Sequence, residues 1–344
     1  MKKFRKIFIA VALVSCFLVS SVSASTTDIT FPVELRAGYA DVTVTIHENT
    51  NAWRSGTTIL AVHGLTGTAA TWNPLIKEMF ASRLWGKRIK RVIALDLPGH
   101  GKSPMPLSLA GGPFGNLLID DNISVIFQTI LYLQSQDLGP RVIMGHSMGG
   151  LAIQGLQESL LAQDLSLAKL GIYRAVLMAP VPAEGAEWNQ GPAADLTPFI
   201  FGDPQDTVVG QYLYIPPQYA GLGSDFMNLD GITVPNVPTL EEFAIYGAPE
   251  PIYTLLQLVG QFPLPRPAAR EGAFSICKGT LLNLISYSQD NLVPQADLDA
   301  LYPYLTGSNC RMFYRSIDTD DACHNMQITN PKRVLKTLMT LPRF

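Results

Sequence analysis

Charged residues, cysteines and histidines are all scarce in this sequence. Asp, Glu, Lys and Arg make up 15% of the 344 residues, and the net charge is −3. No basic tract lies outside the N-terminus, so the electrostatic footprint of a nucleic-acid-binding protein is absent and we expect no nucleic-acid partner. The four cysteines and five histidines show no metal-ligand spacing, and there is no phosphate-binding glycine loop. We therefore expect neither a metal nor a cofactor.

Long apolar runs are missing too, except near the N-terminus. Residues 1–6 are cationic, residues 7–19 are apolar, and Val22-Ser-Ala24 supplies the small residues of a cleavage site. This order predicts a signal peptide at residues 1–24 and an exported protein, periplasmic or secreted. Since no later segment is long and apolar enough to cross a bilayer, we expect no membrane span after the signal is removed.

Two alternatives to cleavage after Ala24 stay open. About 18 apolar residues can span a bilayer, so the segment would then remain as an uncleaved anchor. Leu13-Val-Ser-Cys16 resembles a lipoprotein signal, which would leave a lipid anchor. Phe17-Leu-Val19 argues against the second alternative, because a lipoprotein tether is usually polar there.

Along most of the chain, segments whose apolar residues have the spacing of a strand alternate with segments whose apolar residues have the spacing of a helix. Residues 32–36 and 41–47 alternate in polarity and predict an antiparallel hairpin, which contains His47 as a structural or surface residue. Strands alternating with helices then predict a mostly parallel sheet covered on both faces. The strands are expected at 57–62, 91–95, 142–144, 172–178, 280–287 and 311–315, and the helices at 72–83, 120–136, 148–163, 295–305 and 331–340.

Residues 181–270 break this alternation. Prolines recur throughout the segment, aromatic residues are scattered among them, and only 250–259 has the pattern of a short helix. We interpret the segment as a cap folded over the carboxyl edge of the sheet, inserted between core segments 25–180 and 271–344. Its aromatic residues are equally consistent with an apolar substrate group and with packing inside the cap.

The stretch Gly145-His-Ser-Met-Gly149 stands between a predicted strand and a predicted helix. Glycines two residues before and two residues after a serine fit a tight strand-to-helix turn that presents the serine hydroxyl at the edge of the sheet. Ser147 is therefore the candidate nucleophile. The Met148 amide, next in the chain, is the candidate oxyanion donor, and the Leu65 amide, after the 57–62 strand, is the second.

A serine nucleophile needs a base and a group that orients the base. His63, His100 and His146 all lie in glycine turns, and we expect His63 to brace its loop. His324 follows the last predicted strand without such a turn, so it is the candidate base.

The candidate acid follows another strand. Asp290, after the 280–287 strand, is our choice, and Glu184, after the 172–178 strand, is the alternative. Asp318, Asp320 and Asp321 lie too near His324 in sequence, and we expect them to solvate that loop.

Removing the signal peptide leaves Cys277, Cys310 and Cys323 in an oxidising compartment. Cys277 and Cys310 each precede neighbouring predicted strands at one edge of the sheet. Cys310 and Cys323 are separated by a strand, about 20 Å at about 3.3 Å per residue, whereas a disulfide needs Cα atoms within about 7 Å. We expect a Cys277–Cys310 disulfide and a free Cys323.

Five motifs together resemble the α/β-hydrolase fold superfamily. They are His63-Gly, Asp96-Leu-Pro-Gly-His-Gly-Lys-Ser103, Gly145-His-Ser-Met-Gly-Gly150, Asp290-Asn-Leu-Val-Pro and His324, in that family's order. The resemblance covers about 30–180 and 275–344. It implies an eight-stranded, mostly parallel sheet, a Ser-His-Asp site without a cofactor, a cap after strand 6, and a structural turn role for Asp96.

A serine nucleophile suits esters, thioesters, lactones, amides and some C–C bonds. Haloalkane dehalogenases and epoxide hydrolases of the superfamily have aspartate there, so we do not expect those activities. The sequence predicts an exported hydrolase acting on a small carboxylic ester. The alternatives are an amidase or peptidase, a C–C hydrolase, and a ligand-binding protein on a hydrolase fold. The sequence does not specify the oligomeric state.

Overall fold

The computed structural model describes residues 24–36, 38–106, 117–188, 246–248, 250–258, 260, 264–275, 278–290, 292–307 and 313–341. The predicted signal peptide up to residue 23, most of the predicted cap, and both Cys277 and Cys310 lie outside these residues. Within the described part, no helix combines the length and the apolar character needed to cross a bilayer.

Eight strands form one sheet in the order β1-β2-β4-β3-β5-β6-β7-β8. β2 is antiparallel to both of its neighbours, and all other paired strands are parallel. The predicted eight-stranded, mostly parallel sheet is therefore confirmed. The strands are β1 (Ala24–Leu35), β2 (Gly38–Asn49), β3 (Thr57–Val62), β4 (Ile89–Asp96), β5 (Val142–His146), β6 (Arg174–Met178), β7 (Leu281–Tyr287) and β8 (Tyr314–Ile317).

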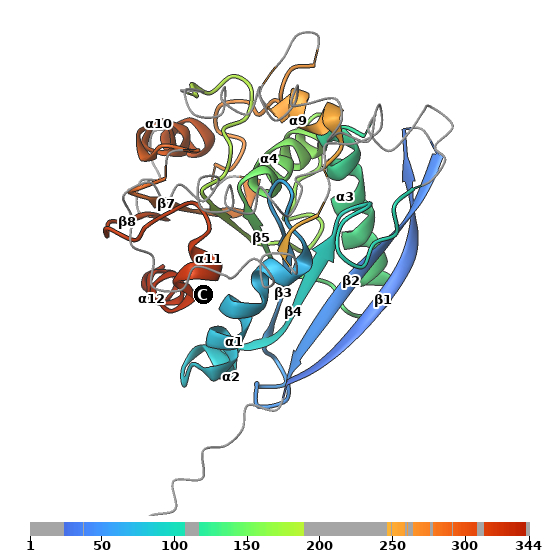
Figure 1. Ribbon diagram of the computed structural model, residues 1–344, viewed down its shortest axis with the longest axis vertical. Coiled ribbons are helices and arrows are strands. Elements are labelled where there is room, and N and C mark those ends of the chain that lie inside the picture. The colour runs from blue at the N-terminus through green and yellow to red at the C-terminus, as the bar shows by residue number, and fades with distance from the viewer. Residues whose placement is uncertain are drawn as a thin grey trace, which may run out of the picture.

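Helices cover both faces of this sheet (Figure 1). Successive residues of β3 alternate between the two cores. Leu60 belongs to the core with α3 (Ile119–Ser135) and α4 (Met148–Leu161), and Ile59 and Ala61 belong to the core with α1 (Asn73–Ala81) and α12 (Pro331–Thr340). Strands buried on both faces are continuously apolar, which is why the central ones were readable from the sequence. The helical elements are η1 (Ala69–Trp72), α1 (Asn73–Ala81), α2 (Trp85–Arg88), α3 (Ile119–Ser135), α4 (Met148–Leu161), α9 (Ile252–Leu258), α10 (Gln295–Thr306), α11 (Met326–Thr329) and α12 (Pro331–Thr340).

The two edge strands differ from their predicted bounds. β8 lies at Tyr314–Ile317, not at 311–315. Most of its side chains are partly exposed, so the apolar signal used to place it was weak. β1 begins at Ala24, not at Pro32, because its first residues are exposed and polar yet still pair with β2.

The described residues at the two ends of the predicted cap lie side by side. Glu184 and Ala268 form a parallel bridge. The Glu184 amide donates to the Pro267 carbonyl at 3.0 Å, and the Ala269 amide donates to the Glu184 carbonyl at 3.3 Å. The chain therefore returns to the place from which it left the core.

Candidate active site

Ser147 is held in a strained turn between β5 and α4. Its φ of +51° and ψ of −122° are unusual for a residue with a side chain and cost about 1–3 kcal/mol. The Ser147 amide donates to the Met178 carbonyl at 3.0 Å, and the Ser147 carbonyl accepts from Gly150 at 2.9 Å. These bonds fix the turn, and Ser147 lines a cavity at the carboxyl edge of the sheet.

The two glycines that flank the turn are required by close approach. A Cβ atom on Gly149 would lie 2.4 Å from the His63 carbonyl oxygen, and one on Gly145 would lie 2.5 Å from Ile153 Cδ1. Both distances are shorter than van der Waals contact. Only glycine lets α4 start this close to β3.

The structure brings His324 and Asp290 together from different loops. His324 Nδ1 lies 2.7 Å from Asp290 Oδ2, and both side chains are buried. Asp290 Oδ1 accepts from the amides of Leu292, at 3.0 Å, and Val293, at 2.9 Å. Because Nδ1 donates to the carboxylate, the His324 Nε2 is the nitrogen left to exchange a proton, and His324 lines the same cavity as Ser147.

His146 contacts the loop that contains His324, a role that the sequence analysis missed. Its Nε2 lies 2.8 Å from the His324 carbonyl oxygen, and the two rings lie 4.7 Å apart between centroids. A carbonyl can only accept, so His146 donates from Nε2. Burial, and next the neighbouring His324, hold the pKa of His146 well below its usual value, so this ring stays neutral.

The loop after β3 lies directly against the candidate nucleophile. A Cβ atom on Gly64 would lie only 2.9 Å from Ser147 Cβ. Among the described residues, no acceptor is found for the amides of Leu65 and Met148. Met148 follows Ser147 in the chain and Leu65 lines the same cavity, so within the described part of the chain both amides are available to a ligand beside Ser147.

His63 braces this loop, as predicted. Its Nδ1 donates to the Gly64 carbonyl at 2.8 Å, and its Nε2 accepts from the Leu97 amide at 3.2 Å. Burial, and next the nearby His100, lower the pKa of His63 to about 3. The ring is therefore neutral, in the tautomer with its proton on Nδ1.

The other acidic candidates lie away from His324. Glu184 is exposed, and so are Asp318 and Asp320. Asp321 instead accepts from Thr319 at 2.6 Å and from Asn330 at 2.7 Å. Asp290 is the one carboxylate that meets His324 in the described part of the chain.

Asp96 occupies the turn position that the family resemblance implied. Its two carboxylate oxygens accept from the Ala69 amide at 2.6 Å and from the Lys102 amide at 3.0 Å. Burial raises the pKa of Asp96, although these two bonds oppose the rise. Its hydrogen bonds are thus those of a turn residue.

The predicted disulfide lies outside the described residues, because Cys277 and Cys310 are not among them. Cys323 is buried and unpaired, as expected. Its sulfur lies 3.5 Å from the Thr329 hydroxyl, and burial raises the pKa of its thiol.

The cavity beside Ser147 is mostly apolar away from the polar cluster. Its polar lining includes Ser147, His324 and His146. The apolar lining residues come from several separate loops and from α9: Leu65, Val181, Trp188, Leu258, Leu292 and Val293.

Comparison with known proteins agrees with this fold. The model of the alpha/beta hydrolase family matches residues 59–334, and the chain belongs to that family. Membership supports a hydrolase acting on a small molecule.

Three individual proteins illustrate how distant the similarities are. The dihydrolipoyllysine-residue acetyltransferase component of the acetoin cleaving system of Pseudomonas putida is 34% identical over 125 residues, which is 35% of this chain and only 29% of that protein. A thermophilic esterase from Thermogutta terrifontis superposes with a TM-score of 0.57 at 14% identity, over 90% of this chain and 97% of the esterase. Epoxide hydrolases from metagenomes of hot environments give a TM-score of 0.54 at 18% identity, over 91% and 97%. The structural similarities establish the fold alone.

Proposed function

We propose that this protein is a serine hydrolase that cleaves carboxylic esters through an acyl-enzyme. The observation that supports this most directly is the buried hydrogen bond between His324 and Asp290, beside the cavity that Ser147 lines. The bond commits Nδ1 of the imidazole to the carboxylate and leaves Nε2 as the base. A strained serine, an oriented histidine and two amides that have no acceptor among the described residues are the parts that acyl transfer needs.

In the proposed mechanism, Ser147 Oγ attacks the ester carbonyl carbon while its proton passes to His324 Nε2. Asp290 stabilises the resulting imidazolium. The Leu65 and Met148 amides donate to the oxyanion, an effect worth about 3–4 kcal/mol per donor. The C–O bond then breaks, and the leaving alkoxide takes the proton from His324.

Water completes the cycle. His324 removes a proton from a water molecule, which attacks the acyl carbon and forms a second tetrahedral intermediate. When this intermediate collapses, the acid is released and Ser147 recovers its proton from His324. No step requires a further reagent.

The candidate nucleophile, Ser147, favours ester hydrolysis over the epoxide hydrolysis of proteins with a similar fold. A serine at position 147 forms an acyl-enzyme with a carbonyl compound. The apolar side of the cavity, which includes Trp188, Leu258 and Leu292, supports an ester with an apolar acyl or alkyl group.

The test combines labelling with turnover. We expect a fluorophosphonate to label the wild-type protein and not Ser147→Ala, and we expect the wild type to hydrolyse p-nitrophenyl esters. Ser147→Ala should lose about three or more orders of magnitude in kcat. Anilides cleaved as fast as esters would indicate an amidase instead, and absence of both labelling and turnover would leave only a ligand-binding role.

We also propose that the protein is exported and that the signal peptide is removed after Ala24. The support is the cationic, apolar and small-residue order of residues 1–24. The intact mass of the protein recovered from the periplasm or medium tests this directly. A mass that includes residues 1–24 would contradict cleavage, and a lipid-modified Cys16 would indicate the lipoprotein alternative.

A further inference from the structure

Glu250, from the predicted cap, is buried against the loop that contains the candidate oxyanion donor. The Thr66 amide donates to Glu250 Oε2 at 2.6 Å, and the Ala248 amide donates to the Thr66 carbonyl at 2.7 Å. The Glu250 side chain is fully buried. Glu250 and Ala248 therefore hold Thr66 at its N–H and its C=O group, respectively.

A buried histidine faces the same carboxylate oxygen. His100 Nε2 lies 3.1 Å from Glu250 Oε2, and His100 Nδ1 lies 3.0 Å from the Pro98 carbonyl oxygen. The carbonyl can only accept, so His100 donates from Nδ1, and a bond from Nε2 to a carboxylate makes the ring an imidazolium. A buried carboxylate needs such a partner.

The surroundings of His100 support this charged pair. The centroids of the His63 and His100 rings lie 5.0 Å apart. Burial by itself would lower the pKa of His100, but Glu250, with smaller contributions from the Pro98 carbonyl and Asp96, raises it above its usual value.

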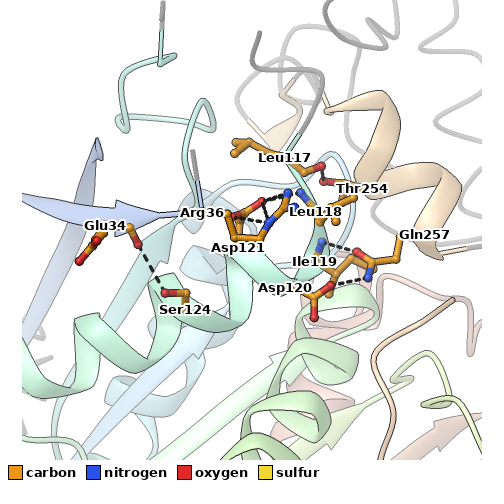
Figure 2. Close-up of polar contacts among 10 residues, drawn as sticks. All are labelled: Glu34, Arg36, Leu117, Leu118, Ile119, Asp120, Asp121, Ser124, Thr254 and Gln257. Atoms are coloured by element: carbon orange, nitrogen blue, oxygen red, sulfur yellow. Dashed lines mark hydrogen bonds and ion pairs between the residues drawn. The ribbon is translucent and has the colours of Figure 1, made fainter. Parts of the chain in front are cut away.

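The segment that follows Glu250 also forms hydrogen bonds to residues 117–120 of the core, as Figure 2 shows. The Thr254 hydroxyl donates to the Leu117 carbonyl at 2.8 Å. The Gln257 side chain accepts from the Ile119 amide at 2.7 Å and donates to Asp120 at 2.6 Å. α9 therefore packs against the start of α3 through contacts that are separate from those of Glu250.

The bonds of His63 and Glu250 act on Leu65 through the two peptide groups that flank it. The Gly64 carbonyl and the Leu65 amide belong to one planar peptide group, which His63 holds through that carbonyl. The Leu65 carbonyl and the Thr66 amide belong to the next group, which Glu250 holds through the amide. With both planes held, the backbone dihedrals of Leu65 have little freedom.

We propose that Glu250 is a positioning residue for catalysis: its bond to Thr66 fixes the second peptide group of Leu65 and so orients the Leu65 amide. This inference rests on the proposed function, in which that amide stabilises the oxyanion. Glu250 touches no reacting atom itself and acts through the loop.

The test compares three variants by kinetics and by hydrogen–deuterium exchange. Glu250→Ala removes the acceptor, Glu250→Gln keeps an acceptor oxygen without the charge, and Thr254→Val removes a bond of the same segment that does not reach Thr66. We expect Glu250→Ala to lower kcat for a p-nitrophenyl ester about 10- to 100-fold, with KM within about threefold, since oxyanion contacts act in the transition state. Exchange in peptides spanning residues 60–70 should be about tenfold faster.

The other two variants are controls for the effect of Glu250→Ala. Glu250→Gln should lie between the wild type and Glu250→Ala, whereas Thr254→Val should lower the melting temperature with unchanged kcat and unchanged exchange at residues 60–70. The proposal is overturned if Glu250→Ala, or Glu250→Gln should the first not fold, keeps wild-type kcat and wild-type exchange. It is also overturned if Thr254→Val loses as much kcat as Glu250→Ala.

A failure of the Glu250 proposal can be distinguished from a failure of the proposed serine hydrolase function. Failure of the wild type to hydrolyse esters or to react with a fluorophosphonate would overturn the proposed function. The exchange measurement would still decide whether Glu250 holds the loop, since it requires no turnover.

Discussion

The side chain of His146 donates to the backbone carbonyl of His324 at 2.8 Å. The residue before the candidate nucleophile therefore holds the loop of the candidate base, across 178 residues of sequence. Asp290 fixes the His324 ring, and His146 fixes its backbone. The two contacts reach His324 from different strands, β7 and β5.

Replacing His146 by leucine should reduce turnover without abolishing it. The His324 carbonyl would lose its donor, and the base would be less well placed relative to Ser147. We expect kcat to fall about tenfold, with little change in KM. His47→Gln is the control: His47 is also buried, with Nε2 unpaired among the described residues, but it lies on β2. Equal losses in the two variants would argue against a role for His146 in positioning.

Replacing Asp290 by asparagine should reverse the tautomer of His324. Asp290 Oδ1 accepts from two amides, so the oxygen of an asparagine would stay there and its NH2 group would face His324 Nδ1. That nitrogen would become an acceptor, and the proton would move to Nε2, which could no longer act as a base. We expect kcat to fall by about 10³–10⁴.

The matched control for that experiment is Asp321→Asn. Asp321 is close to His324 in sequence but bonds to Thr319 and Asn330 instead. Its replacement should leave kcat within about threefold of the wild type, because an exposed or partly exposed carboxylate contributes little. A larger loss there would show that the loop, and not the acid, is what the Asp290 variant disturbs.

Gly149→Ala should destabilise the fold, because its Cβ would lie 2.4 Å from the His63 carbonyl oxygen and 2.6 Å from that of Val62. Both contacts are with backbone atoms of the sheet edge, which cannot move aside cheaply. We expect the free energy of unfolding in urea to fall by about 2–4 kcal/mol. At Gly139, whose added Cβ would have its nearest contact with the Gln134 side chain at 3.2 Å, alanine should change the free energy of unfolding by less than about 1 kcal/mol.

The His100–Glu250 pair should make stability depend on pH. The pKa of His100 is raised in the folded protein, so its stabilisation is complete below the ordinary histidine pKa of about 6.5. It is lost as the pH rises through the raised, folded value. The difference in melting temperature between wild type and His100→Gln should therefore be largest near pH 6 and shrink toward pH 9. A difference that grows with pH would contradict the charged pair.

The sequence predicted those parts of the fold that leave a local pattern, such as an apolar run or a pair of spaced glycines. β3 and β5 are buried on both faces and continuously apolar, so they could be located, and the glycines around Ser147 marked the turn between β5 and α4. Chain order and the common edge of parallel strands were then enough to select Asp290 and His324, which the structure joins by a hydrogen bond.

Contacts between distant segments without periodic patterns could not be predicted. Glu250 meets Thr66 across 184 residues, and the segment around Glu250 has only the weak pattern of a short helix. His146 was likewise assigned to its glycine turn, because its partner is a backbone carbonyl and leaves no mark in the sequence. β8 was misplaced for a related reason: most of its side chains are partly or fully exposed, and its pairing with β7 leaves no periodic pattern in the sequence.

The bridge between Glu184 and Ala268 bears on how such a protein can change its specificity. Because Glu184 and Ala268 are adjacent, we expect that the predicted cap between them can be lengthened, shortened or exchanged without altering the strand order. Glu250 and Gln257 lie in that predicted cap, yet Glu250 accepts from the Thr66 amide and Gln257 contacts the first turn of α3. We therefore expect that a chimaera with a foreign cap on this core must retain residues 246–258 if the loop that contains Thr66 is to keep these contacts.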